Sequence, residues 1–391
     1  MPWNVRGVQE ERVRFVAKWL EKDWSFAELC RQFHVSRKTG YKWLKRRESR
    51  DPQWFRDRPR VAGRRPHALT DAMAQRLLSA RRAHPTWGPR KLRDWLRGKH
   101  PRIVWPALST IGALLKREGL TVPRRRRQQA PPCTQPFAAC DGPNSVWTAD
   151  LKGWFRTRDG ARCYPFTLQD AYSRFLLRCQ ALAYTDAGAL QPLFEAAFRE
   201  FGLPAAIRTD NGPPFASTGL AGLTPLSIWW VRLGIIPQRI EPGHPEQNGR
   251  HERFHRTLSE ATRAPQATRR QQQRAFDRFT WEYNTERPHE ALWGSTPSCV
   301  YTPSARRCPL RLAAIEYPPE MLVRRVRSSG EIKWRNRAIY LSQALAGELV
   351  GLQALEEQRW RLYFGPVELA VLDARKWKLV RPTRRRRPRP R

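Results

Sequence analysis

Apolar residues recur every three or four positions in the first part of the chain, the spacing of amphipathic helices. Between residues 9 and 22 the residues near one helical face are Val13, Phe15, Val16, Trp19 and Leu20. After Ser25, a residue type favoured at helix N-caps, the pattern predicts a short helix to Phe33, a tight connection and a second helix from Arg37. We therefore expect a helix-turn-helix in residues 1–50.

A second set of helical patterns follows an Arg-, Pro- and Asp-rich stretch at 51–66, which we interpret as a linker. Three amphipathic segments cover residues 69–84, 86–100 and 106–120, with Thr86 and Ser109 near the starts of the last two. They predict a second helix-turn-helix module over residues 67–120.

The pattern changes to β-rich runs after a basic, Pro-rich tether at 121–143. Runs at 146–155, 163–173 and 174–184 predict three strands of a meander, followed by a helix at 186–202, a strand at 205–210, a helix at 222–234 and a strand at 235–243. Basic helical segments follow Gly249. The order predicts an α/β domain with a mixed sheet over residues 144–300.

Alternating runs beyond residue 309 predict a small β-barrel over 309–380, and the Arg- and Pro-rich tail at 381–391 is expected to be disordered. The expected fold is thus multidomain: all-α modules, then a mixed α/β sheet, then a small barrel.

Composition adds an electrostatic constraint. The 391 residues include 73 Lys and Arg against 35 Asp and Glu, a formal net charge of +38. Such an excess calls for a polyanionic partner, most commonly a nucleic acid. The 40% hydrophobic content excludes a wholly disordered basic protein, and the seven scattered cysteines show no zinc-finger spacing and are interpreted as reduced thiols. Without a long apolar run or a secretory signal, we expect a cytosolic protein and no membrane partner.

The second helix of the first module carries a candidate DNA-binding face. Arg37, Lys38, Tyr41, Lys42 and Lys45 recur at the intervals that a recognition helix needs in a major groove. The alternative is a basic helix that only faces solvent. In the tether, Arg124, Arg125, Arg126 and Arg127 are expected to lie on phosphates.

Two aspartates mark the candidate active site, because each ends a predicted strand. Asp150 follows the first strand, and Asp210 precedes Asn211 and Gly212, which allow a sharp turn. Side chains at the carboxyl ends of such strands converge in one crevice. Paired carboxylates there suit two Mg²⁺ ions, or Mn²⁺, and phosphoryl transfer. Either aspartate alone could instead be an N-cap or a turn residue.

The third acid is expected on the basic helix after Gly249. Glu252 lies one turn into that helix, pointing back toward the strand ends. Glu246 and Glu260 are the competing candidates, the first in a Pro-flanked loop and the second two turns further along.

These motifs resemble the DDE-type insertion-sequence transposases, whose ribonuclease-H-like catalytic domain is shared with retroviral integrases. The resemblance covers about residues 11–300. It rests on WTADLKG around Asp150, RTDNGPPF around Asp210, PGHPEQNGRHERFHRTL around Glu252, and YNTERPHEALWGSTP at 283–297. Two departures are the 42 positions between Asp210 and Glu252, slightly more than in many relatives, and the lack of an N-terminal zinc module. We therefore expect no structural zinc.

The resemblance implies a function. Asp150, Asp210 and Glu252 would bind two Mg²⁺ ions, and the enzyme would cleave DNA at the ends of a mobile element and join the freed 3′-OH to target DNA. The helical modules would bind terminal inverted repeats, and a homo-oligomer would hold both ends in a synaptic complex in a bacterial, nucleoid-associated setting. The alternative is a transposase-derived regulator that binds DNA without catalysis.

One further motif is ambiguous. His251, Glu252 and His255 form H-E-x-x-H, the spacing of zinc proteases, but the basic surroundings and the strand-end aspartates argue against a protease. His255 is instead expected near scissile DNA, with Arg253 and Arg256 on phosphates; the alternative is that all three are ordinary surface residues.

His289 is more consistent with a packed turn than with a general base. The tryptophans, including Trp87, Trp105, Trp229 and Trp230, are expected mainly in cores.

Overall fold

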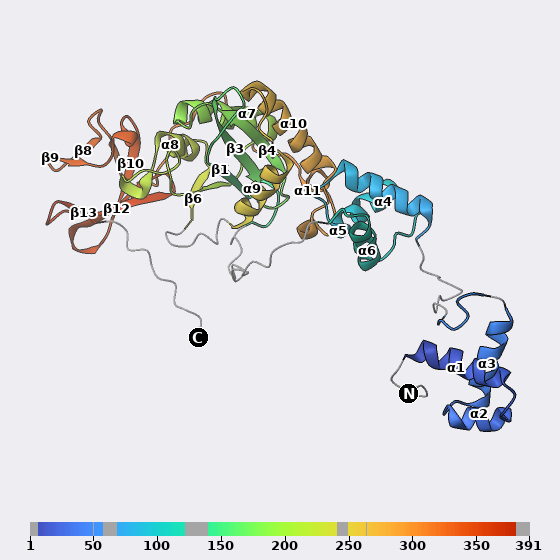
Figure 1. Cartoon of the computed structure of the whole chain (residues 1–391). Coiled ribbons are helices and arrows are strands. Elements are labelled where there is room, and N and C mark those ends of the chain that lie inside the picture. Colours follow the sequence, from blue (N-terminus) through green and yellow to red (C-terminus); the bar gives the residue numbers. More distant parts are fainter. Residues whose placement is uncertain are drawn as a thin grey trace. The chain divides into compact units, whose positions relative to one another are not determined.

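The computed structural model describes residues 7–49, 51–57, 69–121, 140–240, 249–262 and 264–380. These residues form two compact units, 1–68 and 69–391, which are treated separately below (Figure 1). Within the described ranges, every helix is too short or too polar to cross a membrane.

The first unit is a three-helix module, as the periodicity predicts. Its helices are α1 (Val8–Leu20), α2 (Phe26–Gln32) and α3 (Arg37–Glu48). Ser25 and Glu28 form a capping box at the start of α2, and the Ser36 hydroxyl accepts a hydrogen bond from the Thr39 N–H at the start of α3. Two serines therefore fix the short turn between helices that the predicted motif requires.

Gly40 sets the closeness of helix packing in this module. A Cβ atom at Gly40 would lie 2.8 Å from Phe26 Cζ and 3.0 Å from both Cys30 Sγ and Phe15 Cζ. No side chain fits in that space without displacing the aromatic core, so α3 approaches α1 and α2 through a glycine.

The segment after α3 differs from the expected linker. Residues 51–57 return to α1, where Arg12 donates hydrogen bonds to the Phe55 carbonyl at 2.8 Å and to Asp57 at 3.0 Å. Trp54 also packs against the apolar core of the module. The Arg- and Pro-rich composition hides these contacts, because the anchoring partner is 43 positions earlier in the sequence.

The second unit begins with the second predicted helical module. Its helices are α4 (Asp71–Ala83), α5 (Pro89–Lys99) and α6 (Leu108–Arg117). Trp87 and Trp105 lie in its core, as expected. The N-caps of α5 and α6 are Gly88 and Ala107, so Thr86 and Ser109 lie near the starts of these helices, as expected. Pro89 at the first helical position explains the later start of α5.

Ion pairs join this module to the end of the α/β domain. Arg90 lies 2.6 Å from Glu290, and Lys99 lies 3.5 Å from Glu286. His84, stacked on Trp87, lies 2.9 Å from Glu282. Three cationic or titratable groups of one module thus meet three glutamates of the other.

The central sheet has the predicted meander followed by parallel strands. Its strands are β1 (Val146–Leu151), β2 (Phe155–Arg156), β3 (Arg162–Asp170), β4 (Leu176–Leu182), β5 (Ala206–Thr209) and β6 (Ile236–Arg239). The order is β2-β3-β1-β5-β6, with β4 on the far side of β3. β3 is antiparallel to β1 and β4, whereas β5 is parallel to β1 and β6. The mixed sheet is therefore confirmed.

Helices cover both faces of this sheet (Figure 1). α7 (Ala187–Phe201) and α8 (Pro225–Arg232) pack on the face that carries Trp147, Ala149 and Phe166. α9 (Gly249–Ala261) and α10 (Arg269–Thr285) pack on the face that carries Cys163 and Cys179. Because side chains alternate along a strand, Thr148 and Asp150 point to the α9 face.

Helix α10 also covers the edge of β4. The Gln273 side chain accepts a hydrogen bond from the Ala181 N–H at 2.7 Å and donates one to the Cys179 carbonyl at 2.9 Å. Three turns on, Asn284 does the same for the N–H and carbonyl of Leu176, at 2.8 and 3.0 Å. Two amide side chains thus occupy backbone groups that another strand would otherwise bind.

After the short helix α11 (Pro297–Val300) comes a β-rich region. Its strands are β7 (Leu322–Arg325), β8 (Glu331–Trp334), β9 (Arg337–Tyr340), β10 (Leu349–Ala354), β11 (Arg359–Phe364), β12 (Val367–Asp373) and β13 (Lys378–Val380). Short 3-10 helices lie at Leu220–Gly222, Glu290–Leu292, Gln343–Leu345 and Glu356–Gln358.

The C-terminal strands do not confirm the expected barrel. They form an antiparallel sheet in the order β13-β12-β11-β10-β7 and a separate β8-β9 hairpin. Among the described strands no pairing joins β13 to β7, so the sheet has two edges. Its apolar face packs against Ile228 and Val231 of α8, which provide a cover that closure would otherwise supply.

Candidate active site

The strand register brings together the ends of the two strands that carry the candidate aspartates. β1 and β5 are parallel neighbours, with Thr148 opposite Arg208. Asp150 lies near the end of β1, and Asp210 directly follows β5, which ends at Thr209. The carboxyl ends of both strands are therefore at the same edge of the sheet, with the Asp150 side chain on the α9 face.

Helix α9 presents Glu252 on the flank that faces the end of β1. His251, Phe254 and Leu258 are buried, whereas the Glu252 side chain is exposed. With about 100° per residue, Glu252 lies roughly 60° around the helix from His255 and roughly 20° from Ser259. His255 faces Asp150, and Ser259 accepts a hydrogen bond from Lys152. Glu252 therefore shares the helix side that contacts the Asp150 strand.

Thr167 connects both histidines of the H-E-x-x-H sequence. Its hydroxyl lies 2.8 Å from His251 Nε2 and 3.1 Å from His255 Nε2, and Thr167 is opposite Asp150 in the β1–β3 register. The Nδ1 atom of His255 lies 3.8 Å from Asp150 Oδ2. The imidazoles therefore form a layer between the sheet and α9 directly beside the first acid.

Burial controls the protonation of these groups. It lowers the pKa of His255 to about 4 and that of His251 well below its usual value, so both rings are neutral near pH 7. Burial also raises the pKa of Asp210, partly offset by the Gly212 N–H, and lowers the pKa of Lys152. In the absence of a cation, burial therefore disfavours the charged forms of these side chains. A bound cation would offset the free-energy cost of ionising Asp210.

The residues fit a divalent cation. Among the described residues, Asp150, His251 and His255 form a group whose possible ligand atoms all lie within 4.8 Å of one another. Thr167 bonds the Nε2 atom of each ring, so the donors that remain in this group are the Nδ1 atoms and the Asp150 carboxylate. Carboxylate oxygens are the ligands that Mg²⁺ and Mn²⁺ prefer, whereas imidazole nitrogens suit softer divalent metals such as zinc.

The candidate DNA-binding side chains that lie within the described residues are exposed to solvent. All five recognition-helix candidates, Arg37, Lys38, Tyr41, Lys42 and Lys45, have exposed side chains, while Gly40 and Trp43 of the same helix face the core. Arg253 and Arg256 are exposed on α9. The tether arginines 124–127 and the competing acid Glu246 lie outside the described residues.

Two of the open residue assignments have structural answers. His289 is half-buried in an edge contact with the Tyr283 ring, and desolvation lowers its pKa to about 3. Its backbone bonds to Ser295 and Gly294 close a tight turn, as the packing interpretation expects. Trp230 is buried in the core with Trp229 beside it.

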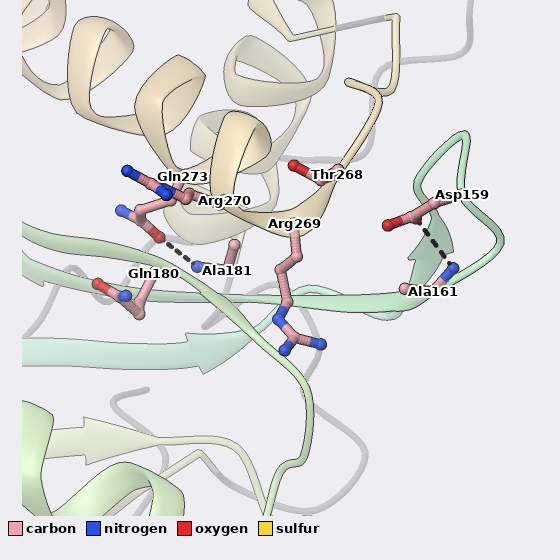
Figure 2. A pocket seen from close by; sticks show the side chains of 8 residues that line it. All are labelled: Asp159, Ala161, Gln180, Ala181, Thr268, Arg269, Arg270 and Gln273. Atoms are coloured by element: carbon pink, nitrogen blue, oxygen red, sulfur yellow. Dashed lines mark hydrogen bonds between the residues drawn. The ribbon is translucent and has the colours of Figure 1, made fainter.

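A pocket of about 420 Å³ lies elsewhere on the domain, between the β2–β3 turn, β4 and the start of α10 (Figure 2). Figure 2 shows Arg269 and Arg270 on its helical side, with Gln273 bonded to the Ala181 backbone. None of the three candidate acids lines this pocket.

Sequence reasoning misses three residues of the site. Thr167 and Ser259 lie outside the quoted motifs, and Lys152 lies within WTADLKG, which assigns it no role; the roles of all three depend on contacts between β1, β3 and α9. Thr167 could be found only from the strand register, because it is 17 positions from its opposite residue Asp150.

Comparison with known proteins identifies the domains. The integrase core domain family matches residues 141–245 and again 233–297, and homeodomain-like families match 8–54 and 39–115. A protein of insertion element IS476 from Xanthomonas euvesicatoria is 32% identical over 193 residues, which cover 48% of this chain and 52% of that protein. The chain thus spans about half the length of this relative.

Two further similarities were found. A protein of insertion element IS407 from Burkholderia multivorans is 28% identical over 247 residues, 60% of this chain and 82% of that protein. The catalytic core domain of HTLV-2 integrase in complex with magnesium has 17% sequence identity and a TM-score of 0.33, covering 41% of this chain and 98% of that one. The comparisons thus give homeodomain-like domains ahead of an integrase core domain, and a similarity to proteins of two insertion elements.

Proposed function

We propose that the chain is a DNA transposase that binds the terminal inverted repeats of a mobile element, cleaves DNA at the element's ends and joins the 3′-OH ends to target DNA. The observation that supports this proposal is the parallel pairing of β1 and β5, in which Thr148 lies opposite Arg208, each two residues before a candidate aspartate. In this proposal Asp150, Asp210 and Glu252, from distant parts of the sequence, meet at one edge of the sheet.

The three acids have defined tasks in this proposal. Asp150 and Asp210 would hold two Mg²⁺ ions, or Mn²⁺, with Glu252 completing the ligand set from the helix. When bound, such ions activate an attacking oxygen and stabilise the leaving one in phosphodiester chemistry. Thr167, His251 and His255 hold the Asp150 side of the site in place, and exposed Arg253 and Arg256 contact phosphates of the strand.

The proposed division of labour follows the chain order. Modules at 1–50 and 67–120 bind element ends, the tether at 121–143 lies on phosphates, and the core at 144–300 performs the reaction. A small barrel fold for 309–380 belongs to the same proposal, as does a homo-oligomer that holds two double-stranded ends together.

Substitution of the acids tests the proposal. In strand transfer on DNA that carries the sequences bordering the reading frame, Asp150→Asn, Asp210→Asn and Glu252→Gln are each expected to reduce the rate by about 100-fold or more, while DNA binding persists. Glu260→Gln is the matched control, because Glu260 is exposed two turns further along the same helix. Full activity in Asp150→Asn, or a loss in the control variant equal to that of Glu252→Gln, would refute the assignment.

A non-catalytic regulator derived from a transposase is the second candidate. It shares the DNA-binding modules, so binding alone does not separate the two. Purified protein that shifts end DNA but cleaves none with Mg²⁺ or Mn²⁺ at several pH values would favour the regulator.

A further inference from the structure

A lysine joins the end of β1 to helix α9 close to the first candidate acid. The Lys152 N–H bonds the Pro165 carbonyl at 2.9 Å, so the β1–β3 pairing continues one residue past the end of β1. Alternation along the strand puts the Lys152 side chain on the same face as that of Asp150. Its ammonium group donates a hydrogen bond to the Ser259 hydroxyl of α9. Lys152 is therefore held by the sheet at its backbone and by the helix at the end of its side chain.

Two contacts between this strand and α9 lie one helical turn apart. Asp150 Oδ2 lies 3.8 Å from His255 Nδ1. The bond between Lys152 and Ser259 is two residues further along the strand and four residues further along the helix. Two residues of a strand rise by about 6.6 Å and four residues of a helix by about 6 Å. Because these rises nearly match, the strand and the helix run in the same direction here and both contacts form together.

The Ser259 hydroxyl makes a second hydrogen bond that links the two contacts. It donates to the His255 carbonyl at 2.7 Å and accepts from Lys152. A hydroxyl has one donor and two acceptor sites, so the two bonds are compatible. Two residues of the strand, Asp150 and Lys152, thus form a closed ring of contacts with two residues of the helix.

The other described contacts of α9 with the sheet fix its position along the strand less strictly. Phe254 and Leu258 are buried, but apolar packing is not directional, whereas a hydrogen bond forms only within a narrow range of distance and angle. The Thr167 hydroxyl bonds both histidines of the helix, but it does so from one point, and Thr167 lies opposite Asp150 in the register. Lys152 adds a polar contact at a second level, which prevents the helix from tilting about the first.

We propose that Lys152 is a positioning residue that sets the axial position of α9 on β1 and thereby the level of Glu252 relative to Asp150. Glu252 lies on the same flank of the helix as Ser259, seven residues away, so a tilt of α9 moves its carboxylate. A metal site tolerates little such movement, because ligand distances vary by only about 0.2 Å. This inference rests on the proposed function, because it takes Glu252 as a metal ligand.

Binding of Mn²⁺ alone tests this role, measured by electron paramagnetic resonance on the full chain without DNA. Ser259→Ala and Lys152→Met are each expected to weaken Mn²⁺ binding by roughly 10- to 100-fold, the loss typical of a residue that supports a metal ligand. Removal of a positive charge by itself favours cation binding, so a weaker site in Lys152→Met reports altered geometry. Because both substitutions remove the same contact, the double variant should bind no more weakly than either single variant.

Two further variants serve as controls. Ser259→Thr keeps the hydroxyl and should retain wild-type affinity for Mn²⁺. Thr257→Ala should also retain it, because the Thr257 hydroxyl bonds the Arg253 carbonyl of its own helix at 3.2 Å but lies roughly 200° around the helix from Ser259. Should Lys152→Met fail to fold, judged by circular dichroism, Ser259→Ala and Ser259→Thr carry the test.

Three outcomes would overturn the positioning role. Wild-type Mn²⁺ affinity in Ser259→Ala, with binding lost in Glu252→Gln, would overturn it and leave the assignment of the acids intact. Wild-type Mn²⁺ affinity in Lys152→Met together with weaker DNA binding would also overturn it, by assigning the lysine to a DNA phosphate. Unchanged Mn²⁺ binding in Glu252→Gln would remove the ligand that Lys152 is proposed to position, and with it the proposed role of Glu252 in catalysis.

Discussion

At the scale of single residues, Thr167 shows that the two histidines of an H-E-x-x-H sequence can have a structural role. The H-E-x-x-H spacing places two imidazoles on one face of α9, and in this protein a threonine hydroxyl bonds both of them. A hydroxyl offers one donor and two acceptor sites, so it can satisfy two neutral rings of opposite tautomer. The two histidines therefore support Asp150 through His255, and Glu252, which lies between them in the sequence, is not used in this contact.

We expect Thr167→Val to weaken this support. The substitution keeps the side-chain shape but leaves two buried imidazole nitrogens unpaired, which should reduce the free energy of unfolding by about 1–3 kcal/mol. Loss of such a supporting contact should also reduce metal affinity by roughly 10- to 100-fold, measured by calorimetric titration with Mn²⁺.

Thr148→Val is the matched control for that substitution. Thr148 is also buried and points to the same face, but its hydroxyl bonds the Gln169 carbonyl at 3.3 Å rather than an imidazole. It should lose stability without a change in metal affinity. Equal metal affinity in wild type and Thr167→Val would show that the threonine has only a packing role.

Individual site residues differ in how far the sequence predicts them. Asp150 and Asp210 are predicted because strand ends are visible as changes of pattern, and Glu252 because a glycine precedes its helix. Thr167 is not predicted, since its role arises from the strand register. The register cannot be read from hydrophobic periodicity, because it depends on which residues of two strands lie opposite each other.

At the scale of elements, the helix-turn-helix depends on one glycine. Gly40→Ala would place a methyl group 2.8 Å from Phe26 Cζ, so the core has to shift. We expect the first module to lose about 1–3 kcal/mol of stability through overpacking. Hydrogen exchange of α1–α3 peptides in the full chain measures this loss locally.

The control is a glycine in open space. Gly98 of α5 has no atom within 4 Å of a Cβ placed on it, so Gly98→Ala should stabilise its helix by about 0.4–1 kcal/mol. If both alanine variants were to exchange at wild-type rates in their own helices, the tight packing at Gly40 would not be limiting.

Elements were predictable where their patterns are long. The helices α1, α4 and α7 and the strands β3 and β4 follow the expected positions closely. Helix starts were less predictable, because α5 and α6 begin at Gly88 and Ala107 without a side-chain cap. The barrel expectation is not confirmed, because alternation predicts strands but not whether the last strand meets the first, and residues of α8 pack against the apolar face of the sheet.

At the scale of the whole molecule, the net charge of +38 predicts strongly salt-dependent DNA binding. Each phosphate that the protein neutralises should add about −0.9 to the slope of log Kobs against log salt. Lys42→Ala should therefore reduce the magnitude of the slope by about 1, measured by fluorescence anisotropy over a salt series.

Lys18→Ala provides the control for that series. Lys18 lies in the same module but pairs with Glu21 at 2.6 Å, so its removal should leave the slope unchanged. A slope that is the same in wild type and Lys42→Ala would place the DNA away from the α3 face.

Acid should destabilise the second unit through buried histidines. The pKa of His289 is about 3 in the folded protein, because burial disfavours its charged form, and about 6.5 when the chain is unfolded. The unfolded state then binds more protons between these values. The contribution of neutral His289 to the free energy of unfolding is complete above about pH 6.5 and is lost as the pH falls toward 3.

Urea unfolding at pH 7 and pH 5 measures this dependence. The midpoint should fall between the two, and it should fall less in His289→Gln than in wild type. His251 shifts in the same direction, so the variant should keep part of the dependence. A variant with the full wild-type dependence would show that His289 is accessible to protons in the native state.

The amide side chains of Gln273 and Asn284 on the rim of β4 constrain how copies of this protein associate. Because these side chains already occupy the rim's backbone hydrogen-bonding groups, a neighbouring copy cannot extend the sheet there by adding a strand. Higher-order assembly must therefore use side-chain surfaces or shared nucleic acid at this side of the domain. Such contacts can be undone after a reaction without unfolding either copy, whereas a sheet running through two subunits is far harder to take apart.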